Sequence, residues 1–366
     1  MIRIYNTFID PRAHQFVRQV LQSSFISEGM VVRDFESQLE KGLGLSNCVA
    51  VNSGTSALHL ALAILGVQQG DEVILPAQTF VATGLVVVQQ LAKPVFADID
   101  YSNGNISPQS IRAKITPRTK AIMVVHWAGY PCDMDEIHQV ASDFRIPVIE
   151  DAAHALGAVY KGRAIGSISP FTCFSFQAIK HLTTGDGGAL CVGSAELKRE
   201  ALRRRWFGID REKAVPSDEG ERAYNIQSIG FKYHLNNYAA ALGLANAQDF
   251  GSRLEKRRKV ADFYDHQLDS LSGTKRFRYL ADRKSAYWLY GMHVERRKDF
   301  VRALRDRGVE ASVIHQRIDR NDIFGGIRKD LVNQEKFDRT QVHIPIHDAI
   351  DLPTAEKVIT SIKMGW

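Results

Sequence analysis

The chain has 366 residues, of which 45% are hydrophobic and 24% charged, and its formal net charge is +6. This length predicts one large domain and a smaller one, and the composition is that of a soluble globular protein. The basic residues cluster beside acidic ones and form no continuous stripe with aromatic residues, so nucleic-acid binding is not expected. A moderate positive field suits an anionic small-molecule substrate instead.

The four cysteines, Cys48, Cys132, Cys173 and Cys191, lie far apart and have no spacing typical of a metal site. We therefore expect buried thiols in a reducing compartment, with no disulfide and no metal. The N-terminus has no signal-peptide pattern, and no apolar run approaches the length of a membrane span. These features predict a cytoplasmic protein that has no membrane partner.

Two amphipathic segments, 13–22 and 32–43, precede a regular alternation of strands and helices. Strands are expected at residues 47–51, 72–75, 94–98, 121–126 and 146–150. Helices are expected at residues 57–65, 80–91, 107–113 and 133–144. Continuous apolar strands that alternate with helices indicate a mostly parallel sheet covered on both faces.

Residues 171–192 depart from this alternation, because two apolar runs enclose Lys180 and the polar glycine turn Thr183–Gly188. The pattern predicts a strand, a tight loop and a second strand. Such a loop holds its lysine against a rigid sheet edge, and its glycines let the backbone approach a ligand. Taken alone, Lys180 is more simply a solvated loop lysine.

The remainder of the chain predicts a second, smaller domain. A charged helix at 194–205 and a polar connection at 210–225 lead to one long helix, 238–268, which crosses between the domains. Strands at 287–294 and 310–314 and helices at 300–306 and 354–362 complete an α+β C-terminal domain. The predicted domains are residues 1–250 and 251–366.

Ligand sites in parallel sheets lie beyond the carboxyl ends of the strands. This rule selects the segments 53–56, 78–80, 126–130 and 151–154. The helix start at 53–56 offers hydroxyls and free N–H groups to a phosphate, although, taken alone, a simple N-cap with a glycine turn is the better explanation. Phe80 suits stacking on a flat ring, with a core position as the alternative.

Asp151 ends an apolar strand, where a carboxylate is costly unless it is paired. A cationic ring nitrogen would pair with it, and a helix cap is the alternative. His154 either faces the same ligand or is a structural histidine. With Lys180, these residues supply what pyridoxal phosphate needs: an anion site, an aromatic ring, a carboxylate for the pyridinium and a lysine for a Schiff base. If no cofactor bound here, the simple explanation of each of these residues would have to be right at every position at once, and that combination is improbable.

Several blocks carry a family resemblance over nearly the whole chain. The most specific are Phe174–Phe176, Lys180 and Thr183–Gly188. The others are Ser27–Gly29 with Phe35–Glu36, Asn52–Leu58, Pro76–Thr83, Glu150–Ala155, Tyr160–Arg163, Ala239–Leu244 and Ile344–His347. By these residues the chain resembles the PLP-dependent nucleotide-sugar aminotransferases of the DegT/DnrJ/EryC1/StrS family. The resemblance implies the α/β architecture of fold-type I, aspartate aminotransferase-like enzymes. Its central sheet is seven-stranded and mostly parallel, with a smaller α+β C-terminal domain.

The resemblance also assigns roles to the cofactor residues. Lys180 corresponds to the Schiff-base lysine, which is the natural general base for the proton shift, and Asp151 corresponds to the pyridinium partner. His154 falls beside the ring and Phe80 falls where an aromatic stacks on it. The residues that correspond to phosphate ligands are Thr55, Ser56 and Ser175.

The chain departs from the family in Gly230–His234, where Lys232 stands in place of an Asn. In the family that Asn reaches the cofactor phosphate of the neighbouring subunit. A lysine would still neutralise a phosphate as a point charge. Because active sites in the family are built from two subunits, the resemblance implies a homodimer.

The resemblance implies transfer of an amino group from L-glutamate to a nucleoside-diphosphate-linked keto-sugar, most commonly a 4-keto-6-deoxy sugar. Such sugars enter O-antigen, other surface glycans or antibiotics. Amination at C3 is an alternative. A sugar dehydratase of the same family has a histidine in place of the lysine, and a non-catalytic regulatory relative would not need both Lys180 and Asp151. Contacts to the sugar and diphosphate are expected from His126, Tyr130, Arg317 and Arg320.

Overall fold

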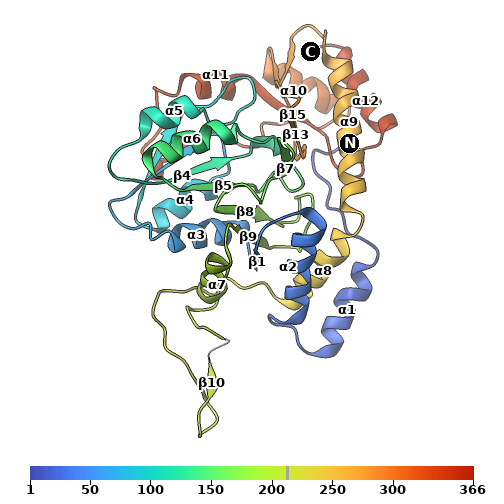
Figure 1. The fold of residues 1–366 in the computed structure, drawn as a ribbon. Helices are drawn as coiled ribbons and strands as arrows, with labels where there is room; N and C mark the ends of the chain where they lie inside the picture. Colours follow the sequence, from blue (N-terminus) through green and yellow to red (C-terminus); the bar gives the residue numbers. More distant parts are fainter. Residues whose placement is uncertain (212–213) are drawn as a thin grey trace.

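A computed structural model describes residues 1–211 and 214–366 of the chain (Figure 1). Two residues of the predicted polar connection at 210–225, Glu212 and Lys213, therefore lie outside the described part.

A seven-stranded sheet forms the centre of the molecule, in the order β1–β9–β8–β5–β4–β2–β3. Its strands are β1 (Cys48–Val51), β2 (Glu72–Pro76), β3 (Lys93–Ala97), β4 (Thr119–Val125), β5 (Val148–Asp151), β8 (Phe171–Ser175) and β9 (Gly188–Val192). β9 is antiparallel to both β1 and β8, whereas β8, β5, β4, β2 and β3 pair in parallel. The prediction of a mostly parallel α/β sheet is confirmed.

Helices cover both faces of this sheet (Figure 1). On one face lie α3 (Gly54–Ile64), α4 (Ala82–Gln89) and α7 (Ala195–Arg204). On the other lie α2 (Met30–Leu43), α5 (Pro108–Lys114), α6 (Met134–Phe144) and α8 (Asn237–Ala247), and α1 (Ala13–Ser23) packs on α8. Because side chains alternate along a strand, β1 sends Val49 and Val51 into the first core and Cys48 and Ala50 into the second.

The C-terminal part contains a second, antiparallel sheet in the order β12–β14–β15. Its strands are β12 (Thr274–Arg276), β14 (Tyr290–Val294) and β15 (Gln341–Ile344), and its helices are α9 (Phe250–Leu268), α10 (Arg297–Asp306) and α12 (Leu352–Lys363). These elements share a core of their own. The predicted boundary at residue 250 coincides with the start of α9.

Shorter elements complete the fold. They are β6 (Val159–Tyr160), β7 (Arg163–Ala164), β13 (Arg283–Lys284), the 3-10 helices η1 (Trp127–Gly129), η2 (Ile318–Arg320) and η3 (Asp322–Phe324), and α11 (Val332–Thr340). Three of them, β13, β6 and β7, pair in that order as a small antiparallel sheet. Ile318, Phe324 and Leu331 belong to the predicted small domain by sequence, yet they pack in the core with α3 and α4. The segment after residue 317 therefore returns to the large sheet.

Two predicted elements are wrong. The single helix 238–268 is two helices, α8 and α9, because Gln248 is extended and Asp249 has a left-handed φ of 56°. Asp tolerates that conformation better than most residues, so neither Gly nor Pro marks the break. The strand expected at 310–314 contributes one isolated bridge, between Ser312 and His343.

A hairpin of β10 (Val215–Pro216) and β11 (Arg222–Ala223) projects away from the body of the molecule (Figure 1). Its strand residues are all exposed. Within residues 1–211 and 214–366, no helix has both the length and the apolar character needed to cross a membrane.

Candidate active site

A cavity of about 350 Å³ opens where several strands of the large sheet end. It lies at the carboxyl ends of the parallel strands, as the general rule for such sheets requires. Seven residues selected from the sequence line it: Ser53, Thr55, Phe80, Asp151, His154, Ser175 and Lys180. The structure thus brings together side chains that are up to 127 positions apart in the chain, since residue numbers 53 and 180 differ by 127.

Lys180 lies in the loop between β8 and β9. The loop is held in place because Thr183 Oγ1 donates to the Phe176 carbonyl (3.0 Å) and Asn246 Nδ2 donates to the Thr183 carbonyl (2.9 Å). Desolvation of the amine by the surrounding protein lowers the pKa of Lys180 to about 7, and the charge of Asp151 opposes this shift. The amine is therefore close to half neutral at physiological pH, which a lysine that forms a covalent bond requires.

Asp151 is the last residue of β5 and is 6% exposed. Its carboxylate accepts hydrogen bonds from Thr83 Oγ1 (2.7 Å) and from the Ala153 N–H (3.1 Å). Burial raises the pKa of Asp151, with these two hydrogen bonds and the Lys180 charge opposing the shift. No cationic group of the described residues forms an ion pair with this carboxylate, so it offers a buried negative charge to a cation in the cavity.

His154 stacks on the indole of Trp288, with ring centroids 3.8 Å apart and planes at 15°. Burial, reinforced by the charge of Lys180, lowers the pKa of His154 well below its usual value, so the imidazole is neutral. Its Nδ1 is buried and has no hydrogen-bond partner in the described part of the chain. Phe80 is 53% exposed at the cavity mouth, 5.3 Å from the ring of His315.

The turn before α3 forms the polar end of the cavity. Ser53 caps the helix by accepting the Ser56 N–H at its Oγ (3.0 Å), and Ser53, Gly54, Thr55 and Ser175 line the cavity. A Cβ added to Gly54 would lie 2.9 Å from the Ser175 Cβ, so this turn and β8 approach as closely as they can. Hydroxyls and N–H groups at a helix start favour a phosphate.

Ser56, predicted as a phosphate ligand, is buried behind this turn. Its hydroxyl donates to Asn52 Oδ1 (2.6 Å), and Ser53 rather than Ser56 lines the cavity. Lys232 is exposed, and its carbonyl accepts a hydrogen bond from Asn52 Nδ2 (3.3 Å), so it lies beside the same turn. Phosphate contacts by Ser56 and Lys232 stay predictions.

His126 and Tyr130 are absent from the residues that line the cavity. His126 is fully buried, with Nε2 2.6 Å from Glu150 Oε2 and Nδ1 accepting the Cys132 N–H (3.0 Å). Tyr130 stacks on Tyr279 at 4.1 Å. Both residues follow β4, but the chain turns their side chains into the protein, where existing partners use their polar atoms. Their role in substrate binding stays a prediction.

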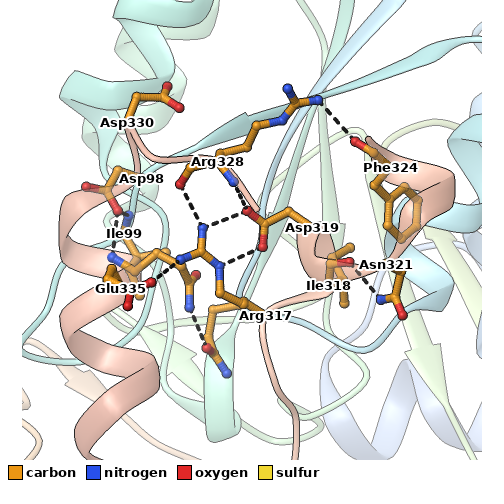
Figure 2. A network of polar contacts seen from close by, with 12 residues as sticks. Asp98, Ile99, Arg317, Ile318, Asp319, Asn321, Phe324, Arg328, Asp330 and Glu335 are labelled. Atoms are coloured by element: carbon orange, nitrogen blue, oxygen red, sulfur yellow. Dashed lines mark hydrogen bonds and ion pairs between the residues drawn. The ribbon is translucent and has the colours of Figure 1, made fainter. Parts of the chain in front are cut away.

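Arg317 is also away from the cavity lining, in a network of polar contacts around Asp319 (Figure 2). Its Nε and Nη2 donate to Asp319 (2.7 and 2.6 Å) and its Nη1 donates to Glu335 (2.9 Å). The guanidinium is 2% exposed and its charge is neutralised by these carboxylates. Arg320 is exposed and hydrogen-bonded to Gln316. Substrate contacts by these two arginines likewise stay predictions.

The cavity residues that were missed in the sequence include Trp288 and His315 from the C-terminal part, and Gln177 and Ile179 beside Lys180. Trp288 precedes β14 and His315 follows the segment 310–314, so neither lies at the end of a strand of the large sheet. The strand-end rule cannot select them, because they reach the cavity only through packing of the C-terminal part against it. Their aromatic rings in an otherwise apolar stretch gave no signal beyond a core position.

The described cavity fits pyridoxal phosphate. The buried carboxylate of Asp151 would suit a protonated ring nitrogen, the amine of Lys180 would suit a Schiff base, and the hydroxyls and N–H groups at the start of α3 would suit the phosphate.

The model of the DegT/DnrJ/EryC1/StrS aminotransferase family matches residues 8–363 of the chain. The chain belongs to this family. One relative is GDP-perosamine synthase of Escherichia coli O157:H7, which is 33% identical over 84% of this chain and 83% of its own length. The crystal structure of the sugar aminotransferase CalS13 from Micromonospora echinospora is 32% identical, with a TM-score of 0.95 and full coverage of both chains.

A further member of this structural group is Spr1654 from Streptococcus pneumoniae in its PLP-form, which is 27% identical with a TM-score of 0.92. It covers 99% of this chain and 98% of its own. These matches place the present chain among aminotransferases along its whole length, and they confirm both the fold and the enzyme class expected from the sequence.

Proposed function

We propose that this protein transfers the amino group of L-glutamate to the keto carbon of a sugar carried on a nucleoside diphosphate, with pyridoxal phosphate as cofactor. The proposed acceptor is a 4-keto-6-deoxy sugar, and a 3-keto sugar is the alternative for the same chemistry. One observation carries the proposal: in a chain of this aminotransferase family, Lys180 and Asp151 line the same cavity as the helix start that suits a phosphate.

Each cavity residue has a distinct task toward the cofactor. When bound, pyridoxal phosphate supplies an electron sink through its protonated ring. Asp151 keeps the ring nitrogen protonated, because an ionised carboxylate raises the pKa of an adjacent cation. Ser53, Thr55 and Ser175 hold the phosphate at the start of α3. Phe80, which lines the cavity, would stack on the ring.

Lys180 has two tasks. Its amine anchors the cofactor covalently, and once released it accepts a proton at Nζ and returns it. A pKa of about 7 suits both tasks, since a neutral amine is needed for attack and for proton uptake. The neutral imidazole of His154 leaves the cavity without a competing positive charge next to Lys180.

The names of the relatives support a sugar acceptor on a nucleotide. One is named GDP-perosamine synthase and another a sugar aminotransferase. A third is named spore coat polysaccharide biosynthesis protein SpsC, from Bacillus subtilis strain 168. We infer a place in the synthesis of deoxyamino sugars for surface glycans such as O-antigen.

We also propose a homodimer in which the active site lies at the subunit interface. The projecting hairpin of β10 and β11 supports this arrangement, because its exposed strands have few contacts within their own chain (Figure 1). Lys232 is exposed next to the turn that precedes α3. In the dimer its ammonium would neutralise the partner's cofactor phosphate.

The test is amino transfer from L-glutamate to a panel of 4-keto and 3-keto sugars on different nucleoside diphosphates, followed by mass and NMR analysis of the product. We expect turnover with one class of keto-sugar and loss of turnover in Lys180→Ala. The matched control is Lys256→Ala, which removes an exposed lysine of α9. Full turnover by Lys180→Ala would refute the proposed mechanism.

A further inference from the structure

The Lys180 amine lies against an aromatic ring. Its Nζ is 3.6 Å from the ring centroid of Trp288, and it makes no hydrogen bond within the described residues. Both residues line the cavity, although they come from different sheets: Lys180 follows β8 and Trp288 precedes β14. The contact with the Trp288 ring thus fixes the position of the Lys180 amine when that amine is not bonded to the cofactor.

Trp288 is itself held on several sides. Its Nε1 donates to the carbonyl of Ile179, the residue before Lys180 (3.1 Å). Its ring stacks on His154 at 3.8 Å and packs beside Tyr5 at 5.5 Å, and the residue is 2% exposed. A side chain fixed in this way keeps one orientation, so it serves as a rigid support for the flexible lysine chain.

An aromatic support has a chemical advantage over a carboxylate. A carboxylate at hydrogen-bond distance would bind the ammonium strongly and keep it charged. A ring face attracts the ammonium more weakly, favouring the contact by roughly 2- to 30-fold in population, and it leaves the neutral amine able to depart. The titratable groups that interact with the amine through their charge are Asp151, His154, His181 and His315.

We propose that Trp288 is the positioning residue for Lys180: its ring face receives the amine whenever that amine is not bonded to the cofactor, and directs it back toward the reacting carbon. This role rests on the proposed function, since the lysine must leave and return during each turnover. It goes beyond that function by assigning a task to a residue of the C-terminal part of the chain.

The test measures how fast the apoprotein captures pyridoxal phosphate, by stopped-flow absorbance across a range of pH. In this reaction the neutral amine adds to the aldehyde carbon and one water leaves, so the rate rises with pH through the pKa of the amine. Trp288→Leu removes the ring face but keeps much of the volume. The contact with the ring stabilises the charged amine, so we expect the midpoint to move down by about 0.4 to 1.5 pH units. The plateau rate, which is reached with the neutral amine, should fall as well, because the lysine chain loses its rigid support.

Trp288→Phe keeps an aromatic ring face but loses the pyrrole ring with its N–H, so its midpoint and plateau rate should lie between those of the wild type and of Trp288→Leu. The matched control is Trp366→Leu, because Trp366 also donates Nε1 to a backbone carbonyl, that of Glu295 (2.7 Å), but far from the cavity. An unchanged midpoint in Trp288→Leu, an upward shift, or identical behaviour of the Phe and Leu variants would overturn the proposal.

A second experiment leaves the size of the Trp288 side chain almost unchanged, so it tests the proposal even if Trp288→Leu does not fold. The chain has four tryptophans, and replacing them with fluorinated tryptophan weakens the negative face of each ring. The midpoint should fall in the wild-type chain and stay constant in Trp288→Phe; equal shifts in both would contradict the proposal. These experiments use no sugar, so their outcome is independent of the keto-sugar experiments that test the proposed function.

Discussion

At the scale of single residues, the carboxylate of Asp151 decides which ligand the cavity accepts. It is buried at the end of β5, with a hydroxyl and an N–H as partners and a pKa raised by desolvation. Thr83 Oγ1, which orients it, lies 2.7 Å from Thr79 Oγ1, so a chain of hydroxyls fixes the carboxylate direction. A cation placed opposite it would compensate the cost of burying the charge.

We therefore expect Asp151→Asn to weaken cofactor binding to the apoprotein. The amide keeps the shape but loses the charge, and a hydrogen bond to a charged group is worth about 1.5–3 kcal/mol, or roughly 10- to 150-fold in the dissociation constant. Titration of the apoprotein with pyridoxal phosphate measures this change. Asp143→Asn, at a hydrogen-bonded carboxylate outside the cavity, is the control. Unchanged affinity in Asp151→Asn would show that the ring nitrogen lies elsewhere.

Individual site residues were predictable where they lie at or after the end of a strand and their side chains point into the cavity. Asp151, His154 and Lys180 line the cavity as their positions after β5 and β8 suggest. His126 follows β4 in the same way, but its imidazole turns inward to Glu150. The backbone direction at a strand end is readable from sequence, whereas the side-chain direction depends on partners distant in the chain.

At the scale of elements, the close packing of β9 against the turn before α3 shapes the phosphate end. A Cβ added to Gly188 would lie 2.6 Å from the backbone of Ser53 and from the Gly54 N. The first residue of β9 is thus pressed against the backbone of the helix start. No side chain fits there without moving the groups that face the phosphate.

Gly188→Ala should therefore lower the free energy of unfolding by about 1–3 kcal/mol, as overpacking does, and also weaken cofactor binding. Gly251→Ala is the control, because a Cβ at Gly251 in α9 meets no atom within 4 Å. In a helix that change is neutral or stabilising by up to about 1 kcal/mol. Urea unfolding of both apoproteins checks the contrast. Equal stability of the two variants would mean that the turn has room to adjust.

Most elements were predictable from hydrophobic periodicity, because continuous apolar strands and amphipathic helices leave a local pattern. The break between α8 and α9 was not, since Asp249 itself takes the left-handed φ, and the nearby glycine, Gly251, lies inside α9. The segment 310–314 has the composition of a strand, but its neighbours allow only one bridge. In both places the long-range packing decides the outcome.

At the scale of the whole molecule, the cavity is completed by the C-terminal part. The central sheet supplies Lys180 and Asp151, and the segments around β14 and after residue 310 supply Trp288 and His315. Burial, reinforced by the charge of Lys180, lowers the pKa of His315 to about 3, so the side of the cavity that the C-terminal part supplies is uncharged. This division explains why the sequence of the large domain alone predicted only one side of the site.

The central claim is that Lys180 bonds covalently to the cofactor. Reduction of the holoenzyme with borohydride fixes that bond, and peptide mass mapping then locates it. The account predicts one cofactor per chain, on the peptide that contains Lys180, and none in Lys180→Ala. Attachment at another lysine, such as Lys232, or equal labelling of wild type and Lys180→Ala would contradict it.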